Sequence, residues 1–310
     1  MLQPIGLLRI VMLVETLWAW PETFHPLRFA RLLVRRMAVK VHPCIERSEL
    51  QQKISGSLTI FMLLLPLAII LIIFTSMVPF PLFFDVLLLL VALQYQTLVK
   101  CSQKVAKALS QQKKVLSREA LEHMVLRETE RLPPIGIAKA TIESLLLRFA
   151  KQYFSVIFYY FIFGGVGALC YRSIYEFSHC WNTKIHRFRL FGYAAAKIIR
   201  IMQFIPVRLY RLIFILAQNI SGGLAAWHNG SKNMCSHVWL LTIQGGALGI
   251  EFSGPAYYNG QKNRFCKCTG QRQERFEDIQ STIYAVQLTK IAILAICLLM
   301  GSVLYSWKPI

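Results

Sequence analysis

Charged side chains are scarce in this sequence, and carboxylates are the scarcest of them. Of its 310 residues only 16% are charged, whereas 55% are hydrophobic and the mean hydropathy is +0.46. A soluble domain carries about a quarter charged residues. Between Ile54 and Thr97 the only carboxylate or base is Asp85, and two successive runs there each exceed the roughly 20 apolar residues that cross a bilayer. The composition therefore excludes an ordinary soluble domain and predicts a membrane protein.

Several motifs that indicate other functions are also missing. None of the eight cysteines has the two-residue spacing of a zinc or redox motif, so free thiols and no metal site are expected. No internal repeat marks a secondary transporter. The apolar segment 2–20 has no basic leader and no small-residue cleavage site, so it is expected to be an uncleaved first span.

Acidic residues are outnumbered by basic ones, 15 against 35, for a net charge of +20. Seven Lys and Arg lie in residues 22–53 and eleven in residues 100–151, on the two flanks of the apolar runs. Because basic loops stay on the cytoplasmic side, this bias predicts a multi-pass protein of the bacterial inner membrane that faces an anionic leaflet. No compact basic domain with interleaved aromatics is present, so nucleic-acid binding is not expected.

The hydrophobic pattern predicts one all-α polytopic membrane domain, 1–310, with about four to six membrane segments. A Pro79-Phe80-Pro81 break divides the apolar stretch into a helical hairpin, because proline stops a helix. Glycines at 164, 165 and 167 interrupt a later apolar segment and predict a broken or re-entrant helix. The expected order is a span at 2–20, a basic interfacial helix at 22–53, the hairpin at 54–99, a solvated cytoplasmic arm at 100–151, broken helices and motifs at 153–220, and a final span at 286–307.

Two local features add detail to this topology. In the helix expected at 25–40, Arg28, Arg31 and Arg35 share one face, which we expect to lie among anionic lipid head groups. Asp85 is a carboxylate within an apolar run, which is by default a functional candidate. It follows the proline break by only a few residues, so we expect it to be in contact with water near the turn.

Short motifs along the chain resemble those of the CobD/CbiB family of cobalamin-biosynthesis proteins, in their order and mutual spacing. The first is similar to the family's His-Pro-Val-Arg, the second to its Arg-Asp-Thr, and the third keeps a long series of glycines and arginines. The motifs are His25-Pro26-Leu27-Arg28, Arg127-Glu128-Thr129, a stretch from Glu143 through Tyr171-Arg172 to Pro206-Val207-Arg208-Leu209, and Trp239 with Gly246 to Gly249 and Gly254-Pro255. The resemblance covers most of the chain. It implies an ATP- and magnesium-dependent enzyme that joins a corrinoid acid to aminopropanol or its phosphate.

The departures from the family pattern concern mainly its acidic residues. Where the family has carboxylates or other polar groups, this chain has Leu147, Lys151, Ser178, Ile199 and Arg200. Magnesium needs carboxylate oxygens, and a lysine or arginine in their place repels the cation. Metal-assisted amidation is therefore not expected, and neither ATP nor Mg²⁺ is expected unless the family activity is retained.

The basic positions of the family pattern are kept although the acids are lost. Guanidinium groups bind phosphate or carboxylate without a metal, so we expect several of these arginines to converge on one anion pocket. The alternative is that they reach separately to lipid head groups. The predicted anion-binding residues are Arg28, Arg127, Thr129, Arg172, Arg187, Arg189 and Arg208, and Glu143 is the one catalytic candidate.

Three functions remain open at this point. The first is the family's amide-forming step, with a corrinoid or a phosphate-bearing small molecule as ligand. The second is a non-catalytic protein on the same scaffold, comparable to AmpE, a related-looking membrane protein linked to cell-wall signalling. The third is a transporter or lipid-binding protein. Since site residues rather than fold decide chemistry, the lost acids favour the second.

Overall fold

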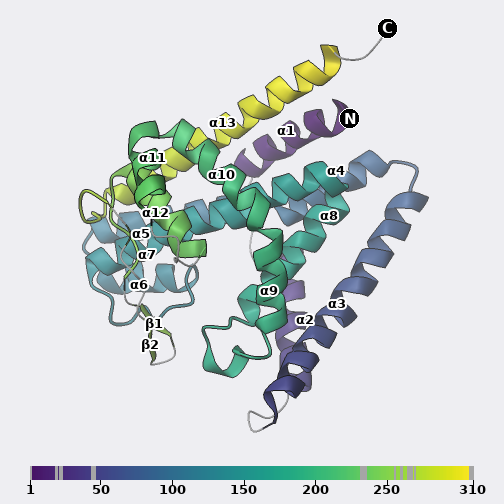
Figure 1. The fold of residues 1–310 in the computed structure, drawn as a ribbon, viewed down its shortest axis with the longest axis horizontal. Coiled ribbons are helices and arrows are strands. Elements are labelled where there is room, and N and C mark those ends of the chain that lie inside the picture. The colour runs from purple at the N-terminus through teal and green to yellow at the C-terminus, as the bar shows by residue number, and fades with distance from the viewer. Residues whose placement is uncertain are drawn as a thin grey trace. The chain divides into compact units, whose positions relative to one another are not determined.

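The computed structural model describes residues 2–17, 20, 24–42, 47–230, 236–254, 256–258, 261–263, 268 and 270–306. Pro255 and Trp307, at the ends of two predicted features, lie outside these residues. The helices are α1 (Leu2–Leu17), α2 (Pro26–Val41), α3 (Glu49–Met77), α4 (Pro81–Ala92), α5 (Gln96–Ser110), α6 (Lys114–Glu122), α7 (Pro134–Arg148), α8 (Ser155–Cys180), α9 (Tyr193–Met202), α10 (Phe204–Ala217), α11 (Ile220–Asn229), α12 (Ser236–Leu248) and α13 (Asp278–Ser306) (Figure 1). A π-helical segment (Phe149–Phe154), a 3₁₀ turn (His186–Phe188) and an antiparallel hairpin of β1 (Ala256–Tyr258) and β2 (Gln261–Asn263) complete the described elements. The predicted all-α class is confirmed.

The chain forms two compact units. Unit 1 contains residues Met1–Ile5, Tyr95–Lys151 and Val207–Ile310, and unit 2 contains Gly6–Gln94 and Gln152–Pro206. In unit 1, α7 packs against α5, α6, α12 and α13. In unit 2, α8 is the central helix and packs against α2, α3, α4 and α9.

Four helical stretches are long and apolar enough to cross a membrane. They are Glu49–Met77, Pro81–Ser110, Pro134–Cys180 and Asp278–Leu299. The segments α1 and α10 are shorter, at 16 and 14 residues, and are not among the four. The predicted multi-pass membrane architecture is confirmed, with candidate spans at the lower end of the expected number.

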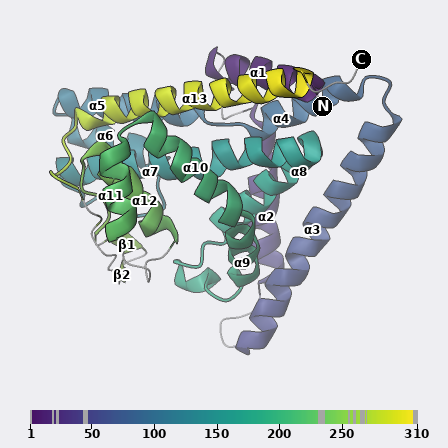
Figure 2. The same cartoon turned by 45° about the horizontal axis from the view of Figure 1, so that its top comes forward.

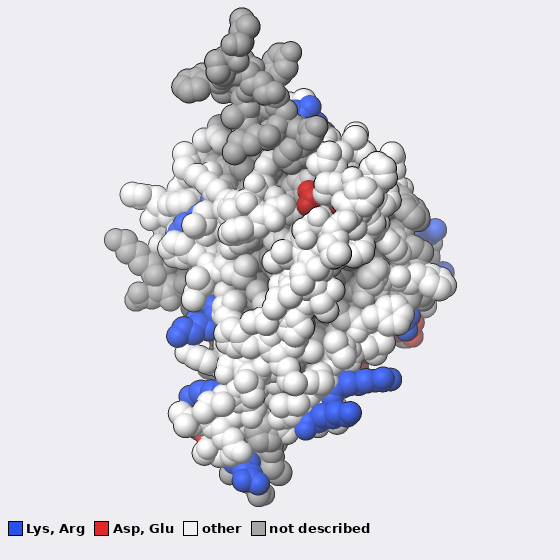
Figure 3. Space-filling model, turned by 90° about the vertical axis from the view of Figure 1, so that its right-hand side faces the viewer, with Lys and Arg blue, Asp and Glu red and all other residues white. Residues whose placement is uncertain are grey.

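The predicted hairpin corresponds to α3 and α4 of unit 2, which meet at a short break and diverge from it, and both helices pack against α8 (Figures 1 and 2). Helix α3 ends at Met77, and Pro81 occupies the first turn of α4, where its missing N–H is not needed. No charged residue lies between Lys53 and Met77, and large apolar side chains such as Phe61, Leu65 and Ile70 are exposed there. Figure 3 shows the middle of this face as largely uncharged, with one acidic side chain in its upper part and with Lys and Arg along its edges, most of them in the lower part. An exposed apolar helix of this kind is suited to contact with lipid.

Helix α8 is broken at Gly164, as the glycine pattern predicts. Gly164 has a φ of 66° and a ψ of −164°, a conformation that only glycine adopts readily. The next residue, Gly165, donates its backbone N–H to Asp85 Oδ1 of α4 at 2.5 Å. A Cβ at Gly165 would lie 2.5 Å from the Asp85 backbone oxygen, so glycine also permits the close approach of α4. Asp85 is partly exposed, and it also caps the second half of α8.

The arm predicted at 100–151 folds into unit 1 as most of α5, all of α6 and all of α7, and α7 begins the candidate span Pro134–Cys180, so the arm is not wholly solvated. Its apolar residues Val105, Leu121 and Met124 are buried. Tyr95, at the start of α5, donates from its hydroxyl to the backbone oxygen of Leu145 in α7 at 3.1 Å. One face of the arm is thus packed against protein, and basic residues such as Lys104, Lys107 and Lys113 are exposed on the other.

The hairpin and the basic residues on its flanks together predict a topology. We expect a reporter fused after Val78, at the end of α3, to report a periplasmic location, since this turn lies between two apolar helices. A fusion after Lys113, between α5 and α6, should report a cytoplasmic one. Alkaline phosphatase and green fluorescent protein fusions measure the two locations, and the reverse pattern would contradict the orientation.

Candidate functional site

The first family-like motif begins α2 and places a buried histidine at its start. His25 precedes the helix, and its Nδ1 accepts the backbone N–H of Leu27 at 3.2 Å, while Pro26 sits at the first helical position. Farther along the helix, Val34 and Ala38 pack in a core with Trp181 and Phe191. The motif therefore sets both the start of α2 and the face that it buries.

A buried ion cluster joins α2 to α8 in unit 2. The carboxylate of Glu176 lies between two arginines: its Oε1 is 2.7 Å from Arg172 Nη2, and its Oε2 is 3.1 Å from Arg31 Nε. Arg31 also donates from Nη2 to Gln94 Oε1 at 2.7 Å. Arg172 and Glu176 are one helical turn apart on α8 and are almost fully buried.

The electrostatics of the cluster are set by two guanidinium groups that face one carboxylate. Burial, together with the charges of Arg172 and Arg31, lowers the pKa of His25 to about 4, so its imidazole is neutral at physiological pH. The imidazole Nε2 is buried and makes no hydrogen bond. Arg31 keeps 29% of its side chain exposed, so it is the member of the cluster that a soluble anion can reach.

The predicted position of Arg31 in the interfacial helix was wrong. The sequence placed it with Arg28 and Arg35 among lipid head groups, but in the structure it turns inward to Glu176. The reason is electrostatic, since a buried carboxylate without a partner is costly. Arg28 and Arg35 are exposed, as expected. The apolar side chains Phe29, Leu32 and Leu33 are exposed too, as in a helix that lies on a membrane.

A second cluster lies in unit 1 and contains the catalytic candidate. Glu143 of α7 accepts from Arg127 Nη2 at 3.2 Å through Oε2 and from the backbone N–H of Ser253 at 2.6 Å through Oε1. Ser253 has a φ of 67°, a conformation that aims its N–H at the carboxylate. Glu143 thereby links the Arg127 loop, where Thr129 is buried, to the loop after α12.

The remaining predicted arginines do not join these clusters. Arg187 and Arg189 are exposed in the connection between α8 and α9, whereas Arg172 is buried, so these three do not share one pocket. The Arg187 guanidinium lies 5.6 Å from the Phe188 ring centroid. Arg208 of α10 is also exposed, whereas Arg127 in the same unit is largely buried against Glu143. The structure therefore shows two separate arginine–glutamate clusters, one in each unit.

A family model described as CobD/Cbib protein matches residues 8–286 of this chain. The chain belongs to the CobD/CbiB family. The cobalamin biosynthesis protein CobD of Chromobacterium violaceum is 28% identical over 258 residues, 82% of this chain and 83% of that protein. CobD of Stutzerimonas stutzeri is 27% identical over 57% of this chain and 59% of its own length, and CobD of Listeria monocytogenes is 30% identical over 53% and 54%. No solved structure matches.

The CobD/CbiB resemblance implies ATP and Mg²⁺, but Glu143 and Glu176, as they are paired here, do not fit a magnesium site. Both oxygens of Glu143 and both oxygens of Glu176 already contact nitrogen donors. Glu128 and Glu130, the other acids between Arg127 and Leu209, are exposed. Among the residues that the structure describes, no three His, Cys, Asp or Glu side chains gather as metal ligands would. Magnesium binds through carboxylate oxygens that are available to it, so no step through the ion is derived for this chain.

Sequence analysis did not predict two members of the Glu176 cluster, Gln94 and Arg31. Gln94 lies in the apolar run, and Arg31 was assigned to the helix surface. A signal for Arg31 was present, because positions 27, 31, 34 and 38 recur at helical spacing and the other three are apolar. An arginine on an otherwise apolar face needs a buried partner, and Glu176 is that partner.

The lowered pKa of His25 predicts a pH dependence of stability. In the unfolded chain His25 takes up a proton below pH 6.5, whereas in the folded chain it does so only near pH 4. Folding stability is therefore lost as the pH falls between these values, by up to about 3 kcal/mol. We expect His25→Asn, which keeps a side-chain acceptor at the helix start, to reduce this loss in thermal unfolding of the detergent-solubilised protein.

The matched control is His228→Asn, since His228 is exposed on α11. It should show the wild-type pH dependence. Equal pH dependence in the wild type and His25→Asn would contradict the assignment of a neutral, buried His25.

Proposed function

We propose that this CobD/CbiB-family membrane protein binds an anionic ligand of cobalamin assembly through Arg31, and that it no longer carries out metal-dependent amidation. The observation that carries the proposal is the buried Glu176 cluster, in which two guanidinium groups share one carboxylate. The ligand class is a phosphate- or carboxylate-bearing small molecule, such as aminopropanol phosphate or the corrinoid acid.

Anion binding is supported by the geometry of Arg31. Its guanidinium contacts Glu176 through Nε and Gln94 through Nη2, and its side chain is partly exposed. Arginine presents five N–H groups in a planar fork, so it can hold Glu176 and still donate to a phosphate or carboxylate. His25 is neutral at physiological pH, so its imidazole adds no positive charge beside Arg31 and Arg172.

Loss of amidation is supported by the state of the two buried glutamates. A metal cation that stabilises the negative charge developing in the transition state lowers the barrier to amide formation by several kcal/mol. This corresponds to about a thousandfold or more in rate. Glu143 and Glu176 could hold such a cation only after release from Arg127, Arg31 and Arg172. Breaking a buried ion pair costs about 3–5 kcal/mol, so the exchange is unfavourable.

The cellular location belongs to the same proposal. The basic flanks of the hairpin favour the bacterial inner membrane, with the loops that carry Lys and Arg on the cytoplasmic side. That side carries anionic lipids, and cobalamin precursors are anionic as well. The motif arginines are exposed on the surface of their own units: Arg28, Arg187, Arg189 and Arg208. The retained-enzyme alternative rests on the family membership alone.

The test is calorimetric titration of the purified protein with aminopropanol phosphate and with the corrinoid acid, in the presence of a chelator. We expect binding without Mg²⁺. Arg31→Lys should weaken it about tenfold to a hundredfold, because a point charge replaces a planar fork. The matched control is Arg36→Lys, since Arg36 is exposed on the same helix and should leave the affinity unchanged.

The loss of catalysis is tested on the same preparation. With ATP, Mg²⁺, the corrinoid acid and aminopropanol phosphate, we expect no product above background by mass spectrometry. Steady turnover that Glu143→Ala abolishes would overturn the proposal. Binding that requires Mg²⁺ would overturn it as well.

A further inference from the structure

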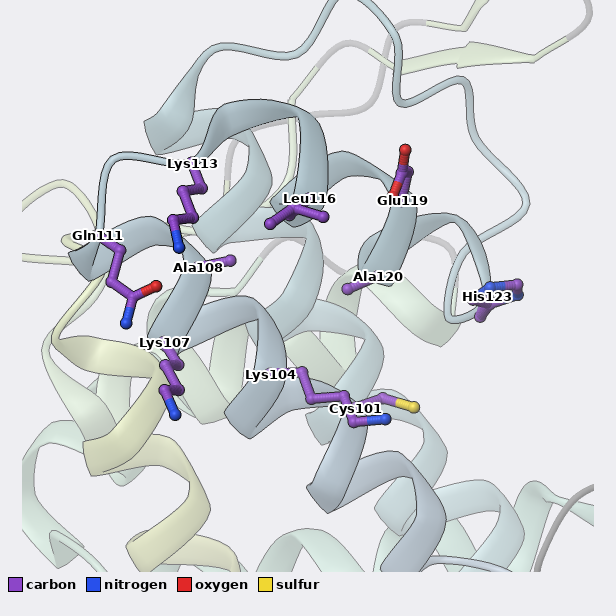
Figure 4. Close-up of a pocket in the computed structure, with 10 residues that line it drawn as sticks. All are labelled: Cys101, Lys104, Lys107, Ala108, Gln111, Lys113, Leu116, Glu119, Ala120 and His123. Atoms are coloured by element: carbon purple, nitrogen blue, oxygen red, sulfur yellow. The ribbon is translucent and has the colours of Figure 1, made fainter.

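A cavity of about 440 Å³ lies between α5 and α6 in unit 1, and its lining shares no residue with either cluster described above (Figure 4). The two helices form a tight hairpin closed by the turn at residues 111–113, where Gln112 has a φ of 57°. Nothing in the proposed function uses this groove, and its lining comes entirely from the hairpin.

Three lysines line the groove and make it basic. Lys104 and Lys107 project from α5, and Lys113 extends from the turn toward α5 (Figure 4). All three are exposed, and none makes an ion pair in the part of the chain that the structure describes. The one acidic side chain of the lining, Glu119, points away from α5 in this view. The groove therefore offers uncompensated ammonium groups to an anion.

The middle of the groove is apolar. Ala108, Leu116 and Ala120 lie between the basic groups, and Leu116 is half exposed. The neighbouring Val115 on α6 is exposed as well, at 66%. A large apolar side chain exposed beside lysines is typical of a helix that lies in the membrane interface, with its apolar groups among acyl chains and its ammonium groups near phosphates. An anion with an apolar body suits this surface better than a fully soluble one.

The position along the chain also places these lysines near the membrane surface. The apolar run that starts in α4 ends at Val99, and Lys100 is the first charged residue after it. Helix α5 rises about 1.5 Å per residue, so Lys104 and Lys107 follow the end of the apolar run by roughly 8 and 12 Å. This is the depth of the polar head groups, which border the hydrocarbon core.

We propose that the groove between α5 and α6 binds the head group of an anionic phospholipid, with Lys104, Lys107 and Lys113 on its phosphate and the apolar floor against its glycerol and acyl carbons. Lysine binds phosphate as a point charge and needs no metal. The site goes beyond the proposed function, since it does not involve the Glu176 or Glu143 cluster. It ties the arm to the membrane on the side that the charge bias favours.

The experiment uses the full chain in nanodiscs of phosphatidylcholine that contain a minor fraction of phosphatidylglycerol. Native mass spectrometry counts the lipids that remain bound to the protein after it is released from the nanodisc. We expect a retained phosphatidylglycerol on the wild type. Lys104→Ala, Lys107→Ala and Lys113→Ala together should lower its apparent affinity about a hundredfold, since each ammonium group near an anionic surface contributes about fivefold.

The matched control replaces Lys100, Lys114 and Lys197 by alanine, which removes the same charge from exposed positions outside the groove. It should retain the lipid, and both variants should keep the wild-type melting temperature. Equal loss of lipid in both variants would show an effect of net charge alone and overturn the proposal. Inorganic phosphate that displaces phosphatidylglycerol at equal concentration would overturn it too, because the ligand would then be a soluble phosphate compound.

Discussion

The buried carboxylate of Glu176 is the constraint on which unit 2 depends. A carboxylate at this depth must be paired, and Arg172 on the same helix and Arg31 on α2 supply the partners. The pairing to Arg31 fixes the rotation of α2 about its axis. It thereby places Val34 and Ala38 in the core with Trp181 and turns Arg35 outward. One interaction thus connects the first motif of the chain to a motif roughly 140 residues later.

The break at Gly164 divides α8, and Arg172 and Glu176 both lie in the half after the break. Asp85 of α4 accepts the N–H of Gly165 and so replaces the intrahelical partner that the break removes. Arg172 follows Gly165 by seven residues, which is about two helical turns. Glu176 follows Gly165 by eleven residues, which is about three turns. A continuous helix would carry these side chains at another rotation, and α4 could not approach a residue with a Cβ at position 165. The glycines are therefore part of the construction of the cluster rather than an interruption of a span.

Much of the fold could be predicted from the sequence, because the strongest signals in a membrane protein are apolar length and proline breaks. The hairpin of α3 and α4, the surface helix α2 and the break at Gly164 all follow from such local patterns. The site could be predicted only in part. Arg172, Glu143 and Arg127 were identified by their place in the motifs, but the pairing of Arg127 with Glu143 and of Arg172 with Glu176 was not, since pairing between distant segments leaves no local signal. Arg187 and Arg189 occupy motif positions as well, yet they are exposed, so a motif position alone does not decide burial.

The chain keeps a CobD/CbiB scaffold while its carboxylates serve as structural partners of arginine. In our account the family's arginines still bind an anion, and the chemistry that a bound cation would support is lost. The most direct measurement is genetic rescue of a bacterial strain that lacks the cobalamin amidation step, scored as growth that requires newly made cobalamin. The account predicts no growth although the protein is expressed and inserted in the membrane. Growth at the level given by an intact CobD, and lost on Glu143→Ala, would contradict it.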